Sequence, residues 1–161
     1  MDTSAYPIPS SASCILQDKE GITTVSQHGE SAQTFTTVIT ATLSVRNGAR
    51  AIDFYKAAFG ATELHRVDDG SGSMVAQLSV SGATFWVADE SPEHMNYSPE
   101  SLGGCSVRML LIVEDPESVC AQATAAGATQ VVAVTEEHGW RLGRIRDPFG
   151  HHWEVGRPVS I

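Results

Sequence analysis

The chain is poor in cysteine and in basic residues, and each shortage narrows the possible functions. Its 161 residues contain three widely spaced cysteines, Cys14, Cys105 and Cys120, and no CxxC pair. We interpret them as reduced thiols in a cytoplasmic protein. The 10 basic residues are outnumbered by 19 acidic ones, and the formal net charge is −9. Because nucleic-acid binding needs clustered Lys and Arg, this balance argues against a nucleic-acid partner.

Long apolar runs are missing as well. No stretch reaches the ~18 apolar residues of a membrane helix. We therefore expect no membrane partner, and we expect no secretory signal, because the segment "MDTSAYPIPSSASC" has neither the basic start nor the apolar run of one. With 42% hydrophobic and 18% charged residues, the composition suits a globular protein with an ordinary core.

Residues 1–36 differ in composition from the rest of the chain. They are rich in Ser, Thr, Gln, Pro and Gly, and "YPIPSSAS" is typical of a loop. We expect a flexible N-terminal leader here. The alternative is an arm that packs across a dimer partner through Tyr6, Ile8 and Ile15.

A pattern of alternating strands and helices begins at residue 37. "TVITATLSV" (37–45) is rich in Thr, Val and Ile and predicts a strand. "NGARAIDFYKAAFGA" predicts a helix that ends at Gly60. Three apolar side chains share one face of this helix: Ile52, Tyr55 and Phe59. "MVAQLSV" (74–80) and "ATFWVAD" (83–89), joined by "SG", predict a β-hairpin.

The second half of the chain repeats this order. "VRMLLIV" (107–113) predicts a strand. "EDPESVCAQATAAGA" predicts a helix, which Asp115 can cap and in which Pro116 suits the first position. "QVVAVTEE", "WRLGRIR" (140–146) and "HHWEV" (151–155) predict three further strands.

The spacing of matching residues indicates an internal duplication. Val45 and Val113 end the first strands of the two halves, and they are as far apart in sequence as Gly82 and Gly150, which precede the last strands. The helix ends "FGA" and "AGA" match after a one-residue gap. We therefore predict an α+β fold of two βαβββ modules, because neither module alone can bury its sheet. The modules span residues 37–90 and 106–158.

Four segments resemble the glyoxalase, bleomycin-resistance and extradiol-dioxygenase superfamily, also called vicinal oxygen chelate. They are "AIDFYKAAFGATE" (51–63), "LSVSGATFWVADE" (78–90), "AAGA" (125–128) and "RLGRIRDPFGHHWEV" (141–155). The resemblance implies that each module forms a half-open cup and that cups pair within a chain or across a dimer. A homodimer is therefore expected. In metal-dependent members, the resemblance implies a divalent ion held by residues on the first and last strands of each module.

The resemblance places these metal positions at Thr40, Trp86, Arg108 and Glu154. Only Glu154 is a good ligand, because Arg stays protonated and Trp offers no donor atom to a metal. Since metal sites need about three protein ligands, we expect no metal cofactor. We hypothesise that an Arg108–Glu154 ion pair takes the place of the ion. The alternative is a divalent metal held by Glu154 with His152 and His138.

The expected ligand site is a cup lined by Thr40, Trp86, Arg108, Trp140, His152 and Glu154. Aromatic rings and an acidic surface suit a small cationic or aromatic molecule, bound without metal as in the bleomycin-resistance branch. The alternative function is a metal-dependent lyase, isomerase or dioxygenase of the glyoxalase type. No catalytic residue is assigned, although His152 beside Glu154 is a candidate base.

Other aromatic and histidine residues are secondary candidates. Phe85 and Tyr97 can supply stacking surfaces, and core packing is the competing interpretation for Phe85. His65 and His94 lie in segments expected at the surface and receive no role.

Overall fold

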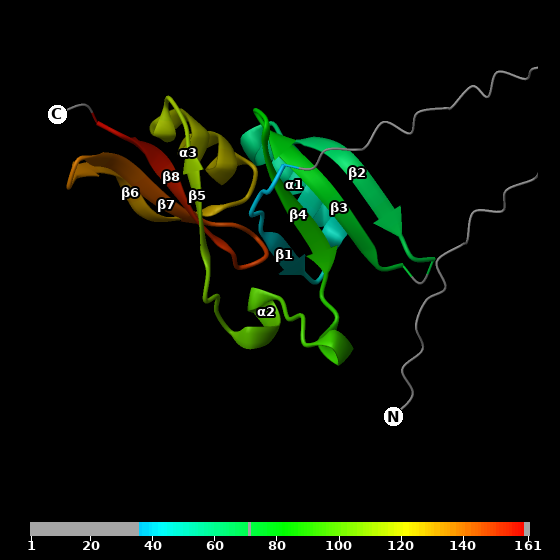
Figure 1. Ribbon diagram of the computed structural model, residues 1–161. Helices are drawn as coiled ribbons and strands as arrows, with labels where there is room; N and C mark the ends of the chain where they lie inside the picture. Colours follow the sequence, from blue (N-terminus) through cyan, green and yellow to red (C-terminus); the bar gives the residue numbers. More distant parts are fainter. Residues whose placement is uncertain (1–35, 71, 160–161) are drawn as a thin grey trace, which may run out of the picture. The chain divides into compact units, whose positions relative to one another are not determined.

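A computed structural model describes residues 36–70 and 72–159, and the predicted leader lies outside this range. Chain contacts divide the sequence into residues 1–36 and 37–161, and the described part belongs almost wholly to the second unit. The described residues form two four-stranded sheets, each with its own long helix (Figure 1). None of the helices described is long and apolar enough to cross a membrane.

Both modules have the predicted βαβββ order. The first contains β1 (Thr42–Val45), α1 (Gly48–Phe59), β2 (Thr62–Asp68), β3 (Met74–Val80) and β4 (Ala83–Asp89). The second contains β5 (Arg108–Ile112), α3 (Pro116–Ala125), β6 (Thr129–Glu137), β7 (Trp140–Arg146) and β8 (His152–Pro158). The segment between them holds η1 (Pro92–His94) and α2 (Pro99–Leu102). The sheet orders β1-β4-β3-β2 and β5-β8-β7-β6 confirm the α+β class and the two modules.

Strand pairing confirms the internal repeat. In the first sheet Thr42 lies opposite Trp86, and in the second Leu110 lies opposite Glu154. The sequence separation of Thr42 and Leu110 equals that of Trp86 and Glu154. It is also the separation of Val45 and Val113 in the sequence repeat. The parallel strand pairs of the two sheets therefore have the same register.

The hairpins of the two modules differ by one residue. Gln77 on β3 lies opposite Trp86, and Arg144 on β7 lies opposite Glu154. The stretch from Arg144 to Glu154 is one residue longer than the stretch from Gln77 to Trp86. One extra residue therefore lies in the turn between β7 and β8.

Two strands differ from the sequence prediction. The first strand begins at Thr42 rather than at residue 37, and the exposed residues 38–39 make no ladder with β4. High strand propensity does not form a strand without a partner edge. The polar, mostly exposed residues 62–68 carry no strand pattern, yet they form β2 because β3 offers them an edge to pair with.

The ends of the two long helices agree with the sequence signals. Helix α1 ends at Gly60, as predicted, with a φ of 64°. Asp115 accepts the backbone N–H of Ser118 at 3.0 Å, so it caps α3 as predicted. Asn47 caps α1 in the same way, by accepting the backbone N–H of Arg50 at 3.0 Å.

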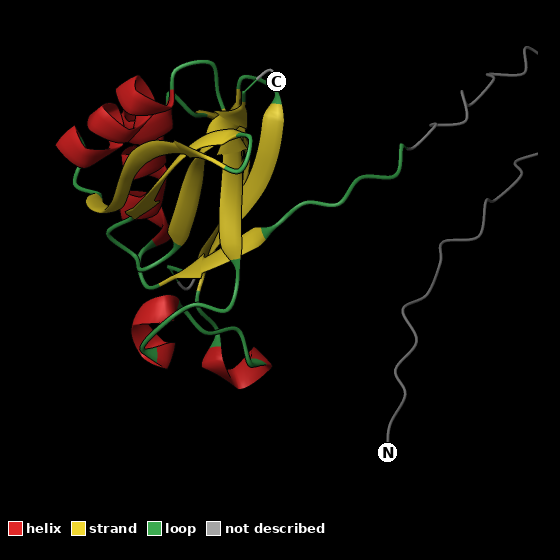
Figure 2. Ribbon diagram, turned by 90° about the vertical axis from the view of Figure 1, so that its left-hand side faces the viewer, coloured by secondary structure: helices red, strands yellow, loops and turns green. Residues whose placement is uncertain are grey.

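The long helices pack on one side of the sheets. Figure 2 shows them in red, together on one side of the yellow strands. Their apolar faces pack there against the sheets and against each other. The opposite faces of the sheets are thereby left for other contacts.

A buried carboxylate in the second module binds a side chain of the first. Asp147, in the turn before β8, is 2% exposed. Its Oδ2 accepts hydrogen bonds from Tyr55 Oη at 2.7 Å and from Trp153 Nε1 at 3.0 Å. Its Oδ1 accepts the backbone N–H groups of Phe149 at 3.0 Å and His151 at 2.9 Å. These donors satisfy a charge that would otherwise be costly to bury, and the Tyr55 bond connects α1 to the second module.

Replacing Tyr55 with Phe removes one donor from this carboxylate and keeps the ring. We expect the free energy of unfolding to fall by about 1–3 kcal/mol, because a buried acceptor loses a partner. Urea denaturation measures the change. Tyr97→Phe is the matched control, since Tyr97 is 42% exposed, and it should change stability by less than about 0.5 kcal/mol. Equal losses in the two variants would contradict the prediction.

The same tyrosine gives an alkaline pH dependence. Burial, and then the negative charge of Asp147, raise the pKa of the Tyr55 hydroxyl well above 10.0. The unfolded chain loses this proton near about pH 10, whereas the folded chain keeps it. The contribution of the Tyr55 hydroxyl to the free energy of unfolding is therefore full below about pH 10 and declines above it.

The stability difference between the wild type and Tyr55→Phe should therefore shrink by about 1.4 kcal/mol per pH unit above about pH 10. Urea unfolding at about pH 9 and at about pH 11 compares the two proteins on either side of the unfolded-state pKa. An unchanged difference would show that burial of Tyr55 does not set its protonation.

Candidate small-molecule site

The predicted site residues of the second module lie on the sheet face that points away from α3. On β8, Trp153 and Val155 point toward the helices and are buried, whereas His152 and Glu154 point the other way and are partly exposed. Alternation along the strand produces this division. The surface that includes Arg108, Arg144, Arg146, His152 and Glu154 is named the basic face.

Glu154 is paired with two guanidinium groups at once. Its Oε1 lies 3.0 Å from Nε of Arg108 and 3.0 Å from Nη2 of Arg144. The hypothesised Arg108–Glu154 ion pair is confirmed. Arg144, which the sequence analysis did not single out, shares the same oxygen. It belongs to β7, directly opposite Glu154 in the strand register.

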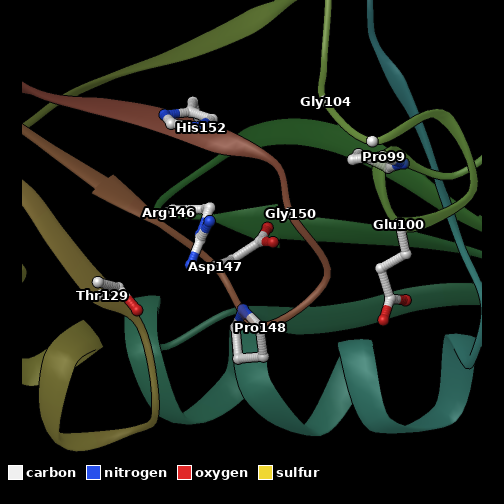
Figure 3. Close-up of a pocket in the computed structure, with 10 residues that line it drawn as sticks. Pro99, Glu100, Gly104, Thr129, Arg146, Asp147, Pro148, Gly150 and His152 are labelled. Atoms are coloured by element: carbon white, nitrogen blue, oxygen red, sulfur yellow. The ribbon is translucent and has the colours of Figure 1, made fainter.

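Two adjoining cavities open beside the basic face. One of about 580 Å³ is lined by Arg108, Arg144, His152 and Glu154, together with residues 104–106 of the segment between the modules. The other, of about 480 Å³, shares His152 and Gly104 with the first and also contacts Arg146. Figure 3 shows Arg146 and His152 beside the second cavity, on neighbouring strands.

Hydrogen bonds to one carboxylate hold the intermodule segment that lines both cavities. Glu90, which follows β4, accepts the backbone N–H of Ser98 at 2.9 Å and the hydroxyl of Ser101 at 2.9 Å. These bonds, with a smaller effect of Arg46, lower the pKa of Glu90 from 4.5 to about 2. Ser98 also caps α2, so the carboxylate fixes the start of that short helix.

The other predicted cup residues lie apart from the basic face. Trp86 is on β4 in the first module. Thr40 precedes β1 and donates its hydroxyl to the carbonyl oxygen of Thr84 at 2.9 Å. Trp140 begins β7, at the end of the strand away from Arg146. The structure thus brings together Arg108, His152 and Glu154, and these do not adjoin the other three.

The structure places three further aromatic or histidine residues. Phe85 is buried, with its ring centroid 5.2 Å from that of Tyr55, so it packs in the core and is not a stacking surface. His65 is exposed on β2, as predicted, and its ring lies edge-to-face against that of Trp86, with 6.3 Å between the ring centroids. No sequence pattern places His65 beside Trp86, because β2 lacks the apolar alternation that marks a strand. Tyr97 lines a cavity of about 300 Å³ beside β1.

The side chains at the family's metal positions do not fit a metal ion. Glu154 Oε1 already contacts two cationic groups, and a guanidinium beside it repels a third cation. In residues 36–70 and 72–159, no three His, Cys, Asp or Glu side chains are grouped to hold a metal. His138 precedes β7, whereas His152 pairs with the last residue of that strand. The length of β7 separates them by roughly 20 Å, so the alternative ligand set is not assembled.

Comparison with known proteins places this geometry in a family. Residues 37–155 match the model of the glyoxalase/bleomycin resistance protein/dioxygenase superfamily. An uncharacterized Mycobacterium tuberculosis protein is 42% identical over 122 residues, covering 73% of this chain and 72% of that protein. The structure of an Arabidopsis thaliana gene product is 31% identical with a TM-score of 0.60, covering 77% of this chain and 100% of that one. TioX from Micromonospora sp. ML1 is 26% identical with a TM-score of 0.57, covering 76% and 100%. The chain belongs to the glyoxalase/bleomycin resistance protein/dioxygenase superfamily.

Proposed function

We propose that this protein binds a small organic molecule at the basic face without a metal cofactor. The observation that carries the proposal is the contact of Glu154 with both Arg108 and Arg144. A carboxylate engaged by two guanidinium groups is a poor metal ligand. The neighbouring cavity of about 580 Å³ has the size of a site for a small organic ligand.

The charge of the basic face does not suit the cationic ligand that the sequence suggested. Trp86 and His65 form a partly exposed pair of rings in the first module, and these rings do not line the cavity beside the basic face. The basic face carries arginines at three positions against one glutamate, which disfavours a cation there despite the chain's net charge of −9. Local charge outweighs net charge at contact distance because salt screens charges beyond about 10 Å.

We also propose that a second copy of the chain covers the open sheet faces. The helices α1 and α3 pack together within one chain, so the faces opposite them stay open. Apolar side chains on these faces are exposed, with Val67 at 51% in the first module, and Leu110 at 49% and Ile112 at 60% in the second. Exposed apolar surface of this kind is typical of an interface.

Metal content tests the metal-free part of the proposal. Protein purified without an affinity tag, then incubated with Ni, Zn, Mn or Fe(II) and dialysed, should retain far less than one ion per chain. Replacing Glu154 with Gln should leave that content unchanged, because the carboxylate is engaged by arginines. Plasma mass spectrometry measures it. Near-stoichiometric metal that disappears in Glu154→Gln would defeat the proposal and favour a metal-dependent enzyme.

Light scattering after size-exclusion chromatography tests the dimer. The wild type should have twice the mass of one chain, and Leu110→Asp should shift it toward one chain by placing a charge in the apolar interface. Met95→Asp is the control, because Met95 is 81% exposed in the segment between the modules. A monomeric wild type would refute this part of the proposal.

A further inference from the structure

Charge on the basic face is organised in rows across the strands. Arg146, His152 and Arg108 lie opposite one another on β7, β8 and β5. The next row contains Arg144, Glu154 and Leu110. Neighbouring strands are about 4.8 Å apart, so the guanidinium groups of both rows lie within reach of one small ligand.

The fold does not require these arginines, because the first module does without them. The register of the parallel strand pairs makes Thr40 the counterpart of Arg108. The register of the hairpins makes Gln77 the counterpart of Arg144 and Ser79 the counterpart of Arg146. All three counterparts are uncharged, although both modules have the same order of strands and helix. The arginines are therefore a property of the second module's surface and not of its scaffold.

The arginines have more donors than the protein satisfies. In the part of the chain that the structure describes, Arg108 and Arg144 have ion-pair contacts with Glu154 alone. The buried Nε of Arg144 has no acceptor there. The side chain of Arg146 has neither a hydrogen bond nor an ion pair among the described residues. Glu154 is thus paired with two of the three arginines, which leaves an excess of positive charge and of N–H donors on the basic face.

An apolar surface continues from the charged rows. Leu110 stands beside Glu154, and the following row contains Leu142 and Ile112 on either side of Gly156. Gly156 is buried, and the Leu142 side chain fills the space beside it, where a Cβ would collide with Leu142 and with the backbone of β7. A molecule lying along the strands would therefore meet cationic donors at one end and apolar side chains at the other.

We infer that the basic face recognises the anionic group of a small organic acid, with the acid's apolar body lying over Leu110, Ile112 and Leu142, between this face and the proposed second copy. A carboxylate, sulfonate or phosphate accepts paired N–H donors from guanidinium groups. Glu154 holds Arg108 and Arg144 close together and competes with the ligand for them. This inference rests on the proposed small-molecule function and assigns a ligand class to it.

Isothermal titration calorimetry of the full-length protein tests the inference, with three probes that share a naphthalene ring and differ in charge. The probes are 1-naphthoate, the neutral 1-naphthamide and the cationic 1-naphthylmethylammonium, and inorganic sulfate is titrated separately. Naphthoate should bind at least about tenfold more tightly than the amide, as expected for a charge-assisted contact. Added salt should weaken the binding of naphthoate, because it screens the contact between charges. Sulfate should bind more weakly than naphthoate, because it lacks the apolar body.

Variants separate the arginine contact from general effects. Arg144→Gln should weaken naphthoate binding on the order of tenfold and leave the amide unaffected. Arg50→Gln makes the same change on the exposed side of α1 and should have no effect. Glu154→Gln should strengthen naphthoate binding, because it removes the competing carboxylate. Opposite signs for the two basic-face variants exclude misfolding as the cause, and circular dichroism verifies each fold.

The outcomes distinguish this inference from the proposed function. Equal affinity for naphthoate and the amide, unchanged in Arg144→Gln, would overturn the anion preference and leave small-molecule binding standing. Weaker naphthoate binding in Glu154→Gln would also overturn it. Binding of none of the naphthyl probes would overturn the inference, and the metal content would still decide the metal-free proposal.

Discussion

The carboxylate of Asp147 connects the two modules through a buried hydrogen bond and fixes which way the last strand faces. Its Oδ2 binds Tyr55 from α1 and Trp153 from β8, while its Oδ1 closes the turn before β8. With Trp153 held inward by this bond, strand alternation requires His152 and Glu154 to point outward. The orientation of the site residues on β8 therefore depends on a buried hydrogen-bond network centred on Asp147.

A second carboxylate, Glu154, organises the surface that results. Alone on an open sheet face it would attract cations, but Arg108 and Arg144 converge on one of its oxygens and reverse the local sign of charge. The Glu154 oxygen that could bind a cation is thus occupied within the protein. A third carboxylate, Glu90, fixes the segment that walls the cavity through Ser98 and Ser101.

Sequence reasoning predicted the fold well because its signals were local or repeated. The helix stop at Gly60, the cap at Asp115 and the equal spacing of the two halves all reappear in the structure. The polar strand β2 was missed because only the edge of β3 makes it a strand. Arg144 was missed for a related reason. Its position opposite Glu154 depends on the antiparallel register of β7 and β8, which no short motif shows.

The extra residue in the turn between β7 and β8 makes the two modules non-interchangeable. The corresponding stretch of the first module, residues 80–83 between the paired Ser79 and Thr84, has no carboxylate. Only the longer turn can wrap its backbone N–H groups around Asp147 and present Oδ2 to Tyr55. A chain built from two first modules would keep both sheets yet lack this connection. The duplicated halves have thus become a complementary pair, in which one half supplies the acceptor and the other the donor.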